Sequence, residues 1–176
     1  TPINDAPMAS ETTISLDEDS TYTGTLFGTD VEGDDMTFAI LTNPVNGTIL
    51  LSDTSAGAYT YSPNENFNGS DSLSYSVSDG TLSDTGQVNI VVNAINDTPV
   101  ISVLADTTID EDGAIDIVLT ASDIDEDALT FSASADTSAV IASVSTDTLS
   151  VSLVDNWNGS SILMVVVSDG SATDTT

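Results

Sequence analysis

Carboxylate side chains occur in short runs that recur along the chain. The first set is Asp17-Glu18-Asp19, the acids between Asp30 and Asp35, Asp79, and Asn96-Asp97. The second set is Asp110-Glu111-Asp112, the acids between Asp123 and Asp127, and Asp169. Calcium prefers about six to eight hard oxygen ligands of this kind. These runs therefore indicate divalent-cation binding as the first chemistry to consider.

No residue of the chain can neutralise these acids. The 176 residues include 29 Asp and Glu but no Lys, Arg or His, so the formal net charge is -29. Two like charges about 4 Å apart repel by roughly 1 kcal/mol in water and roughly 4 kcal/mol near a protein surface. Wherever folding gathers the acids, a cation from outside must offset this repulsion. Calcium fits this role better than magnesium, which retains water ligands and requires octahedral geometry.

The missing residue types exclude most catalytic chemistry. Without His and Cys the chain can form no His-based triad, thiol nucleophile or ordinary zinc site. Without Lys and Arg it has no counter-charge for phosphate, so we expect no nucleic-acid partner. No apolar stretch is long enough for membrane insertion. A carboxylate-pair glycosidase is compatible with the composition, but we expect that the chain is not an enzyme.

The sequence contains two copies of one unit. INDAP (3–7) returns as INDTP (95–99), GTDVEGDDMTFA (28–39) as ASDIDEDALTFS (121–132), and FNGSDSLSYSVSDG (67–80) as WNGSSILMVVVSDG (157–170). The spacing falls from 93 residues (28 to 121) to 90 residues (67 to 157), so a deletion must lie between Phe131 and Trp157. We assign the first domain, with its leading linker, to residues 1–97 and the second to residues 98–176.

Each unit is predicted to be all-β, because apolar residues alternate in short segments bounded by Asn-Gly and Asp-Gly turns. The alternating segments are 21–27, 36–41, 59–61, 73–77 and 88–92. This pattern predicts two tandem seven-stranded Greek-key β-sandwiches of the Ig or cadherin type. The expected core residues are Phe38, Tyr61, Phe67, Tyr75 and Ile90 in the first unit, and Phe131, Leu153, Trp157 and Val166 in the second.

The second unit is expected to lack its last strand within this chain. The last strand of the first unit, 86–93, would have its counterpart from Thr176 onward, where the sequence ends. We expect further chain to supply that strand. The alternative is a strand lent by a neighbouring molecule, which would join molecules end to end.

The sandwich topology predicts where the acidic loops meet. The loops after the first and fifth strands lie at the end with the exit linker, and those after the second and sixth strands lie at the other end. The loop at 64–66 would then join Glu18 at the exit end. The alternative is that Asp and Asn merely form turns. An EF-hand is excluded, because Ala128 and Ser134 replace its glycine and its closing glutamate.

The order of these residues resembles bacterial cadherin-like repeats. The matching features are Glu18, Asp30-x-Glu32-Gly33 before a Phe strand, Asp79-Gly80, and Asn96-Asp97-x-Pro99. The resemblance covers nearly the whole chain, twice, and implies Ig-like repeats of large secreted or surface adhesins with calcium at each joint. Carried over by position, it implies that the cation between the units is held by Glu18, Asn96, Asp97, Asp123, Asp125 and Asp169. The matching half-site, which would face a preceding repeat, is Asn4, Asp5, Asp30, Asp34 and Asp79.

The chain also departs from the cadherin pattern. The L-D-R-E motif of animal cadherins is absent, and the second Asn of the linker motif is Ala6 in one copy and Thr98 in the other. The number of ions at each joint is therefore left open, and the homophilic adhesion of animal cadherins is not implied.

The expected function is a calcium-rigidified spacer or stalk of an extracellular bacterial adhesin or surface fibre, with neighbouring repeats as partners. One alternative is a calcium-dependent polysaccharide-binding module, for which exposed aromatic residues are needed and Tyr22 and Tyr59 are the candidates. The other is a self-assembling filament subunit, a homo-oligomer of the chain.

Overall fold

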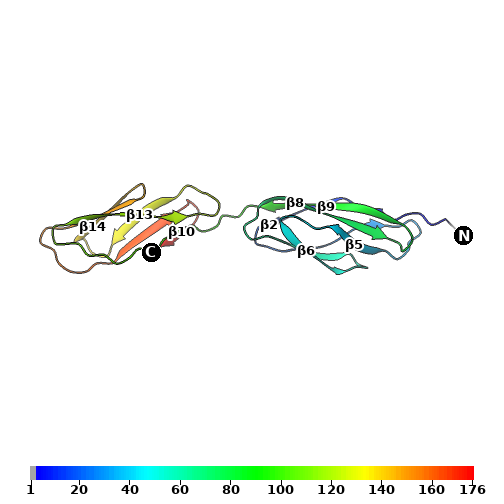
Figure 1. The fold of residues 1–176 in the computed structure, drawn as a ribbon, viewed down its shortest axis with the longest axis horizontal. Coiled ribbons are helices and arrows are strands. Elements are labelled where there is room, and N and C mark those ends of the chain that lie inside the picture. Colours follow the sequence, from blue (N-terminus) through cyan, green and yellow to red (C-terminus); the bar gives the residue numbers. More distant parts are fainter. Residues whose placement is uncertain (1–2) are drawn as a thin grey trace. The chain divides into compact units, whose positions relative to one another are not determined.

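The computed structural model describes residues 3–176 and divides the chain into two compact units (Figure 1). Unit 1 ends at Ile95 and unit 2 spans Asn96–Thr176. Both units are built from β-strands and loops, which confirms the predicted all-β fold class. Within residues 3–176 no helix is long and apolar enough to cross a membrane.

Unit 1 is a sandwich of a four-stranded and a three-stranded sheet. The larger sheet has the order β2 (Thr12–Asp17), β9 (Ser83–Asn93), β8 (Gly69–Ser78) and β5 (Thr37–Thr42). The smaller sheet has the order β3 (Tyr22–Thr25), β7 (Ala58–Pro63) and β6 (Gly47–Asp53). The first strand of the sandwich is split, since β1 (Met8–Ala9) pairs with β4 (Gly28–Thr29) whereas β2 runs parallel to the end of β9.

The core of unit 1 follows the period-two alternation of the strands. Along β9 the side chains of Val88, Ile90 and Val92 are buried while their neighbours face solvent. The predicted core residues Phe38, Tyr61, Tyr75 and Ile90 are buried, and Phe67 packs half-buried against them.

Tyr75 ties the first strand of the sandwich to this core. Its hydroxyl oxygen lies 2.6 Å from the carbonyl of Ser10 and 2.7 Å from that of Phe27, and it accepts the Ser10 N–H at 3.1 Å. Gly86 faces the ring from β9, where an added Cβ would lie 2.7 Å from a Tyr75 ring carbon. The absence of a side chain at Gly86 thus makes room for the tyrosine.

We expect Tyr75→Phe to lower the free energy of unfolding of unit 1 by about 1–3 kcal/mol, because buried backbone groups lose a hydrogen-bond partner. Urea unfolding followed by circular dichroism measures this change. Tyr22→Phe is the matched control, since its half-buried side chain lies outside this network. Equal unfolding midpoints for Tyr75→Phe and the parent protein would contradict the proposed role of the hydroxyl.

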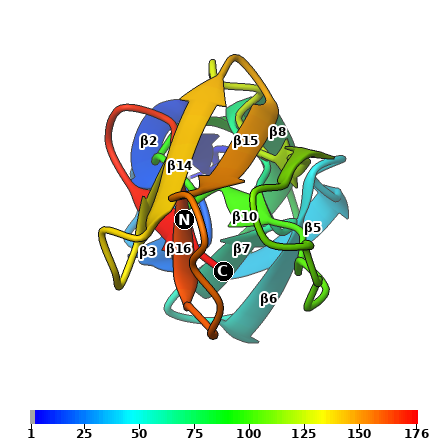
Figure 2. The ribbon, with the colours of Figure 1, turned by 90° about the vertical axis from the view of Figure 1, so that its left-hand side faces the viewer.

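Unit 2 repeats most of this architecture (Figure 2). One sheet has the order β11 (Ala114–Val118), β15 (Thr148–Leu153) and β14 (Val140–Ser145). The other has the order β13 (Thr130–Ala135), β16 (Leu163–Ser168) and β17 (Thr173–Thr175). The short strands β10 (Val100–Ile101) and β12 (Ala121–Ser122) form a separate pair.

The length difference between the repeats lies in one hairpin turn. In unit 1, residues 52–58 separate Leu51 from its partner Tyr59, whereas in unit 2 residues 145–148 separate Val144 from Leu149. The turn between β14 and β15 is therefore three residues shorter, within the interval that the sequence predicted.

The core of unit 2 is less completely buried than that of unit 1. Leu149, Val151, Val165 and Val167 are buried, whereas the predicted core residues Phe131, Leu153 and Trp157 are half-buried at its margin. The prediction for Val166 was wrong, because it lies between the inward-facing Val165 and Val167 and so points to the other face of β16.

The last strand of unit 2, β17, is three residues long. β17 pairs with β16 from Thr173 to Thr175, and the Thr176 N–H and carbonyl exchange hydrogen bonds with Val165. Its counterpart β9 continues beyond the equivalent point as far as Asn93. The second unit thus contains the start of a strand that the sequence was expected to lack, and the expectation about the rest of that strand stays a prediction.

Candidate metal centres

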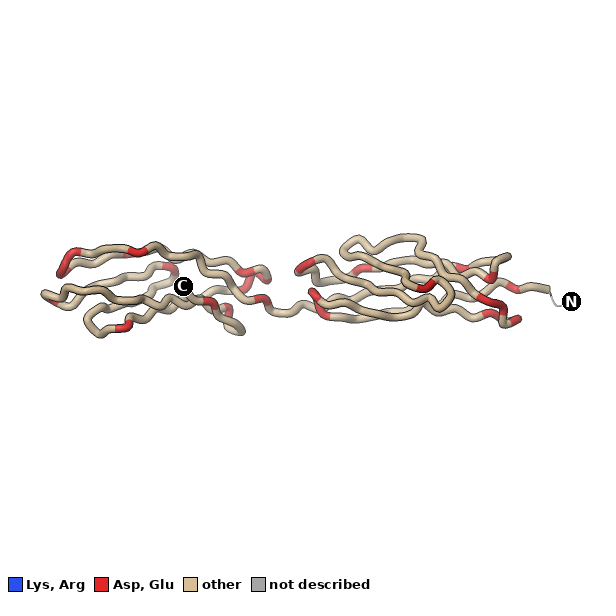
Figure 3. The backbone as a smooth tube through the Cα atoms, turned by 90° about the horizontal axis from the view of Figure 1, so that it is seen from below, with Lys and Arg blue, Asp and Glu red and all other residues tan. Residues whose placement is uncertain are grey.

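Acidic residues gather mainly in the loops that connect the strands (Figure 3). Each unit presents one group of acids on the loop between its second and third sandwich strands. In unit 2 this loop contains Asp123, Asp125 and Asp127, and in unit 1 it contains Asp30, Glu32 and Asp34. In each unit the linker that precedes the unit contacts this acidic loop.

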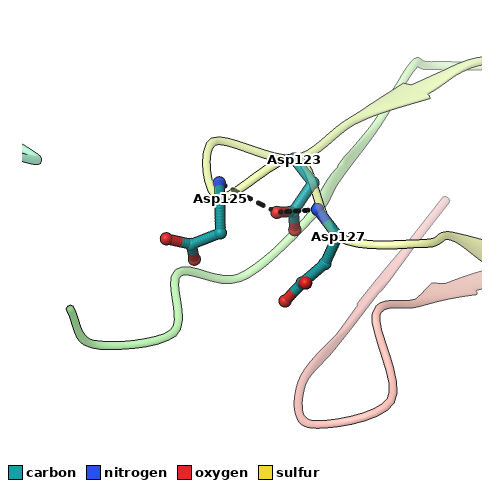
Figure 4. Close-up of side chains that lie close together, drawn as sticks. All are labelled: Asp123, Asp125 and Asp127. Carbon is teal, nitrogen blue, oxygen red and sulfur yellow. Dashed lines mark hydrogen bonds between the residues drawn. The ribbon is translucent and has the colours of Figure 1, made fainter.

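In unit 2, Asp123 organises the acidic loop through one carboxylate oxygen only. Its Oδ1 accepts hydrogen bonds from the backbone N–H groups of Asp125 at 3.0 Å and Asp127 at 3.2 Å (Figure 4). Its Oδ2 is buried and accepts no hydrogen bond. One carboxylate oxygen from each of the three aspartates lies within 4.8 Å of the others. Three converging carboxylate oxygens, together with a buried Asp123 oxygen that has no donor, suit a hard cation.

The linker residues of unit 2 lie against this loop and against the hairpin at Asp169. The Asn96 side-chain amide donates to Asp169 Oδ2 at 2.9 Å, and the Asp97 backbone N–H donates to Asp125 Oδ2 at 2.7 Å. Five of the six residues predicted for the site between the units are thus brought together within unit 2. These residues are Asn96, Asp97, Asp123, Asp125 and Asp169.

Hydrogen bonds keep the Asp169 carboxylate ionised. The backbone N–H of Ala172, the Asn96 side-chain amide and the backbone N–H of Ser171 lower the pKa of Asp169 below its ordinary value of 3.8. In unit 1 the backbone N–H of Leu82, then the Asn4 amide and the backbone N–H of Thr81, lower the pKa of Asp79 in the same way. Both carboxylates therefore carry full negative charge at neutral pH.

Unit 1 carries the same arrangement at its own leading linker. The Asn4 amide donates to Asp79 Oδ2 at 2.8 Å, and the Asp5 backbone N–H donates to a Glu32 carboxylate oxygen at 3.3 Å. Asp30 Oδ1 accepts three backbone N–H groups from Glu32, Gly33 and Asp34 at 2.9–3.1 Å. Asp30 Oδ2, like Asp123 Oδ2, is buried without a hydrogen bond. The predicted half-site of Asn4, Asp5, Asp30, Asp34 and Asp79 therefore lies together in unit 1.

Two further candidates, Glu32 and Asp127, belong to acidic runs found in the sequence but were not among the residues assigned to the two sites. Glu32 stands where Asp125 stands in unit 2, and Asp127 completes the triplet with Asp123 and Asp125. The alternate spacing of acids in Asp30-x-Glu32-x-Asp34 and Asp123-x-Asp125-x-Asp127 is the signal that points to both residues.

Glu18 lies at the opposite end of unit 1, and only 5% of its surface is exposed. Its Oε1 accepts the backbone N–H of Ile95 at 2.7 Å, while its Oε2 is buried and accepts no hydrogen bond. Its counterpart in unit 2, Glu111, is exposed. A buried carboxylate oxygen without a donor is costly, so Glu18 is the third acid whose environment favours an external cation.

The loop at 64–66 is held to this end of unit 1 by Asp19, which accepts the Asn66 backbone N–H at 3.0 Å. Unit 2 repeats the contact between Asn156 and Asp112 at 2.7 Å. Asp19 and Asp112 therefore each hold a loop through a backbone hydrogen bond. This is the turn-forming role of aspartate that the sequence analysis gave as the alternative to metal binding.

The lowered pKa of Asp169 predicts a pH-dependent contribution to the stability of unit 2. Because the folded pKa lies below 3.8, this contribution is fully present above about pH 5 and is lost as the pH falls through the folded pKa. The difference in unfolding free energy between the parent and Asp169→Asn should therefore shrink below pH 3.8, as measured by urea unfolding in EDTA. If this difference in unfolding free energy stays constant from pH 6 to about pH 2, the hydrogen bonds to the Asp169 carboxylate do not stabilise the folded state.

Comparison with known proteins establishes the family of the chain. The family model of the bacterial Ig domain matches residues 4–91 and again residues 96–176. The chain belongs to the bacterial Ig domain family. Its two bacterial Ig domains correspond to units 1 and 2, and the resemblance to Ig-like bacterial repeats is confirmed. A search of curated protein sequences gave no match.

Solved structures extend the likeness of the two bacterial Ig domains to cadherins. Human protocadherin-24 EC1-2 shares 14% sequence identity at a TM-score of 0.62, over 99% of this chain and 94% of that chain. The human desmocollin-1 ectodomain shares 16% identity at a TM-score of 0.50, over 97% of this chain and 40% of that chain. At these identities the likeness shows the fold alone, which is that of cadherin repeats.

An endo-fucoidan hydrolase of glycoside hydrolase family 107 also matches, with 19% identity and a TM-score of 0.44. The alignment covers 97% of this chain but 27% of the hydrolase. The chain thus spans about a quarter of that enzyme, and a likeness this weak says nothing about activity.

Proposed function

We propose that the two bacterial Ig domains are a spacer segment in the stalk of an extracellular bacterial adhesin or surface fibre, and that calcium bound at the joints stiffens the stalk. The partners in this proposal are the neighbouring domains. The observation that carries it is the recurrence in both domains of the same contacts between linker and acidic loop, with Asp30 Oδ2 and Asp123 Oδ2 each buried without a hydrogen-bond donor.

A bound cation would supply the counter-charge that these buried carboxylate oxygens lack. An ionised carboxylate oxygen removed from water requires a hydrogen bond or a counter-charge, and the chain contains no Lys, Arg or His to supply one. Carboxylate and carbonyl oxygens at flexible spacing favour calcium over magnesium. In the second domain the proposed ligands are Asn96, Asp97, Asp123, Asp125, Asp127 and Asp169.

The chain path supports placing the cation at the joint. Ile95, whose N–H binds Glu18, is followed directly by Asn96, whose side chain binds Asp169. We propose that Glu18 supplies the ligand from the preceding domain, and that the first domain receives the equivalent ligand from a domain before it. A cation shared in this way would restrict the linker and so hold successive domains in one orientation.

The polysaccharide-binding alternative requires exposed aromatic faces. Tyr59 is 3% exposed and belongs to the core of the first domain, and Tyr22 packs half-buried beside it with ring centroids 6.2 Å apart. These two residues therefore offer no open stacking platform, and among the aromatic residues of the first domain Phe27, 55% exposed, is the one whose ring is open to solvent.

Calcium binding can be tested by isothermal titration of the EDTA-treated chain. We expect binding with a dissociation constant of about 0.1–1 mM, typical of extracellular modules. Asp123→Asn should abolish binding to the second domain, whereas Asp147→Asn, which removes an exposed acid from the β14–β15 turn, should leave it unchanged. Absence of calcium binding by the parent protein, or equal binding by the two variants, would refute the proposed site.

A further inference from the structure

Strand β6 lies at the edge of the three-stranded sheet of the first domain (Figure 1). It pairs with β7 on one side and with no strand of the described residues on the other. In the second domain the equivalent edge strand β14 has β13 close beside it, whereas β5 and β6 do not approach each other in this way. The first domain therefore has an open sheet edge at β6.

The hydrogen-bond pattern of β6 directs several backbone groups at this open edge. The Asn64 N–H donates to the Asn46 carbonyl at 2.8 Å, so these two residues form a hydrogen-bonded pair. Hydrogen-bonded and non-hydrogen-bonded pairs alternate along an antiparallel ladder, so Thr48 and Leu50 also bond with β7. The residues between them direct their N–H and C=O groups away from β7. These residues are Gly47, Ile49 and Leu51.

This edge lacks the features that usually prevent strand pairing. Natural edge strands are commonly protected by charged side chains, by proline or by a bulge. Residues 36–52, which include nearly all of β5 and β6, are the longest stretch of the chain without an acid. The irregularity in the β6–β7 register lies at the far end of the strand, between Leu51 and Asp53. From Gly47 to Leu51 the edge is therefore regular and uncharged.

The start of β6 is held in place by Asp71 on β8. The Asp71 carboxylate accepts the backbone N–H groups of Val45 and Asn46, each at 2.9 Å, and the Tyr61 hydroxyl at 3.0 Å. Tyr61 lies on β7 and is fully buried in the core. Because the edge is already ordered, a strand that pairs with it has little conformational entropy of β6 to overcome.

We propose that two copies of the chain pair side by side through β6, antiparallel across a two-fold axis at Ile49. Ile49 then exchanges both of its free backbone hydrogen bonds with Ile49 of the second copy. Gly47 does the same with Leu51 of the second copy, and Leu51 with Gly47 of that copy. The two three-stranded sheets become one six-stranded sheet. This pairing involves no residue of the calcium sites and does not rest on the proposed function.

The charge pattern around β6 favours a second copy as the occupant. In the proposed register Leu50, which is 66% exposed, faces Thr48 of the second copy, and Asp53 faces Val45 of that copy. No carboxylate of the strand lies opposite another, so the direct repulsion between like charges is avoided. Two chains of net charge -29 repel each other least where they meet through an acid-free edge. The contact is isologous, so it closes as a dimer.

The test is sedimentation equilibrium of the EDTA-treated chain in about 0.5 M NaCl, which screens the net charge. Leu50→Glu places a carboxylate in the contact, on a side chain that is already exposed. Thr23→Glu is the matched control, because it adds the same charge at an exposed position on β3, the opposite edge of the same sheet. Thr48→Lys tests the register, since its ammonium group would lie opposite the carboxylate of the Leu50→Glu chain.

Hydrogen exchange gives a second measure that reports on individual residues. The amides of Ile49 and Leu51 face the open edge, so their exchange should slow as the protein concentration rises. The amides of Thr48 and Leu50 bond with β7 in every state and serve as the internal reference.

We expect the parent chain and Thr23→Glu to show the same concentration-dependent monomer–dimer equilibrium. Leu50→Glu should weaken dimerisation by at least about tenfold, because the two-fold axis makes each substitution count twice. Leu50→Glu mixed with Thr48→Lys should associate more tightly than Leu50→Glu alone. The proposal is overturned if the parent stays monomeric at millimolar concentration, if the two Glu variants dimerise equally, if the mixture shows no recovery, or if exchange at Ile49 and Leu51 is independent of concentration.

Discussion

Saturating calcium should raise the free energy of unfolding of the second domain by about 1.5–3 kcal/mol, and Asp123→Asn should remove most of that gain. This magnitude follows from mass action at about 10 mM calcium with a dissociation constant of about 0.1–1 mM. Asn retains an oxygen for the Asp125 and Asp127 N–H groups but loses the charge of the buried Oδ2. Urea unfolding followed by Trp157 fluorescence measures the second domain specifically.

The behaviour without metal separates calcium binding from a purely structural role of Asp123. In EDTA the variant should be at least as stable as the parent, because one of several mutually repelling charges is gone. Asp147→Asn should show the full calcium effect. If the variant is destabilised equally with and without calcium, Asp123 stabilises the loop through its hydrogen bonds and does not bind the metal.

Leu73→Ala should destabilise the first domain by about 2–5 kcal/mol, the usual range for a fully buried leucine. Leu73 is 1% exposed and faces Val88 across β8 and β9. Its counterpart Leu163 is half-buried, so Leu163→Ala should cost less than about 2 kcal/mol. The two variants form a matched pair, because they remove the same atoms from equivalent strands.

Urea unfolding followed by circular dichroism for the first domain and by Trp157 fluorescence for the second gives both values. Equal losses would mean that Leu163 is packed as tightly as Leu73 in solution. A larger loss at Leu73 supports the difference in core completeness between the domains.

The repeat architecture was predictable because its signals are local or repeated. Alternation in 73–77 and 88–92 predicts strands with one buried face, and the recurrence of the whole pattern predicts two domains of one fold. The continuous run Leu163–Ser168 lacks this alternation, so the sequence could not decide which of Val165, Val166 and Val167 face the core. Register is fixed there by pairing with β13, which is a tertiary contact.

The candidate site was predictable in its residues but not in its hydrogen bonding. Asp123 and Asp169 could be assigned to one end of a domain from strand order alone. The two carboxylate oxygens of Asp123 differ: Oδ1 accepts hydrogen bonds from the loop backbone, whereas Oδ2 is buried without a donor. This difference depends on the path of the backbone. The burial of Glu18 depends on the return of the chain to Ile95, which lies far away in the sequence. Neither feature has a local sequence signal.

Small-angle scattering during a calcium titration tests the central proposal most directly. If calcium stiffens the joint, the EDTA-treated chain should show a broad distribution of interatomic distances that lengthens and sharpens with a midpoint of about 0.1–1 mM calcium. The same titration of Asp123→Asn should leave the distribution broad, while Asp147→Asn should follow the parent. A distribution that does not change while calcium binds would contradict the stiffened stalk, because the metal would then stabilise a domain without restricting the joint.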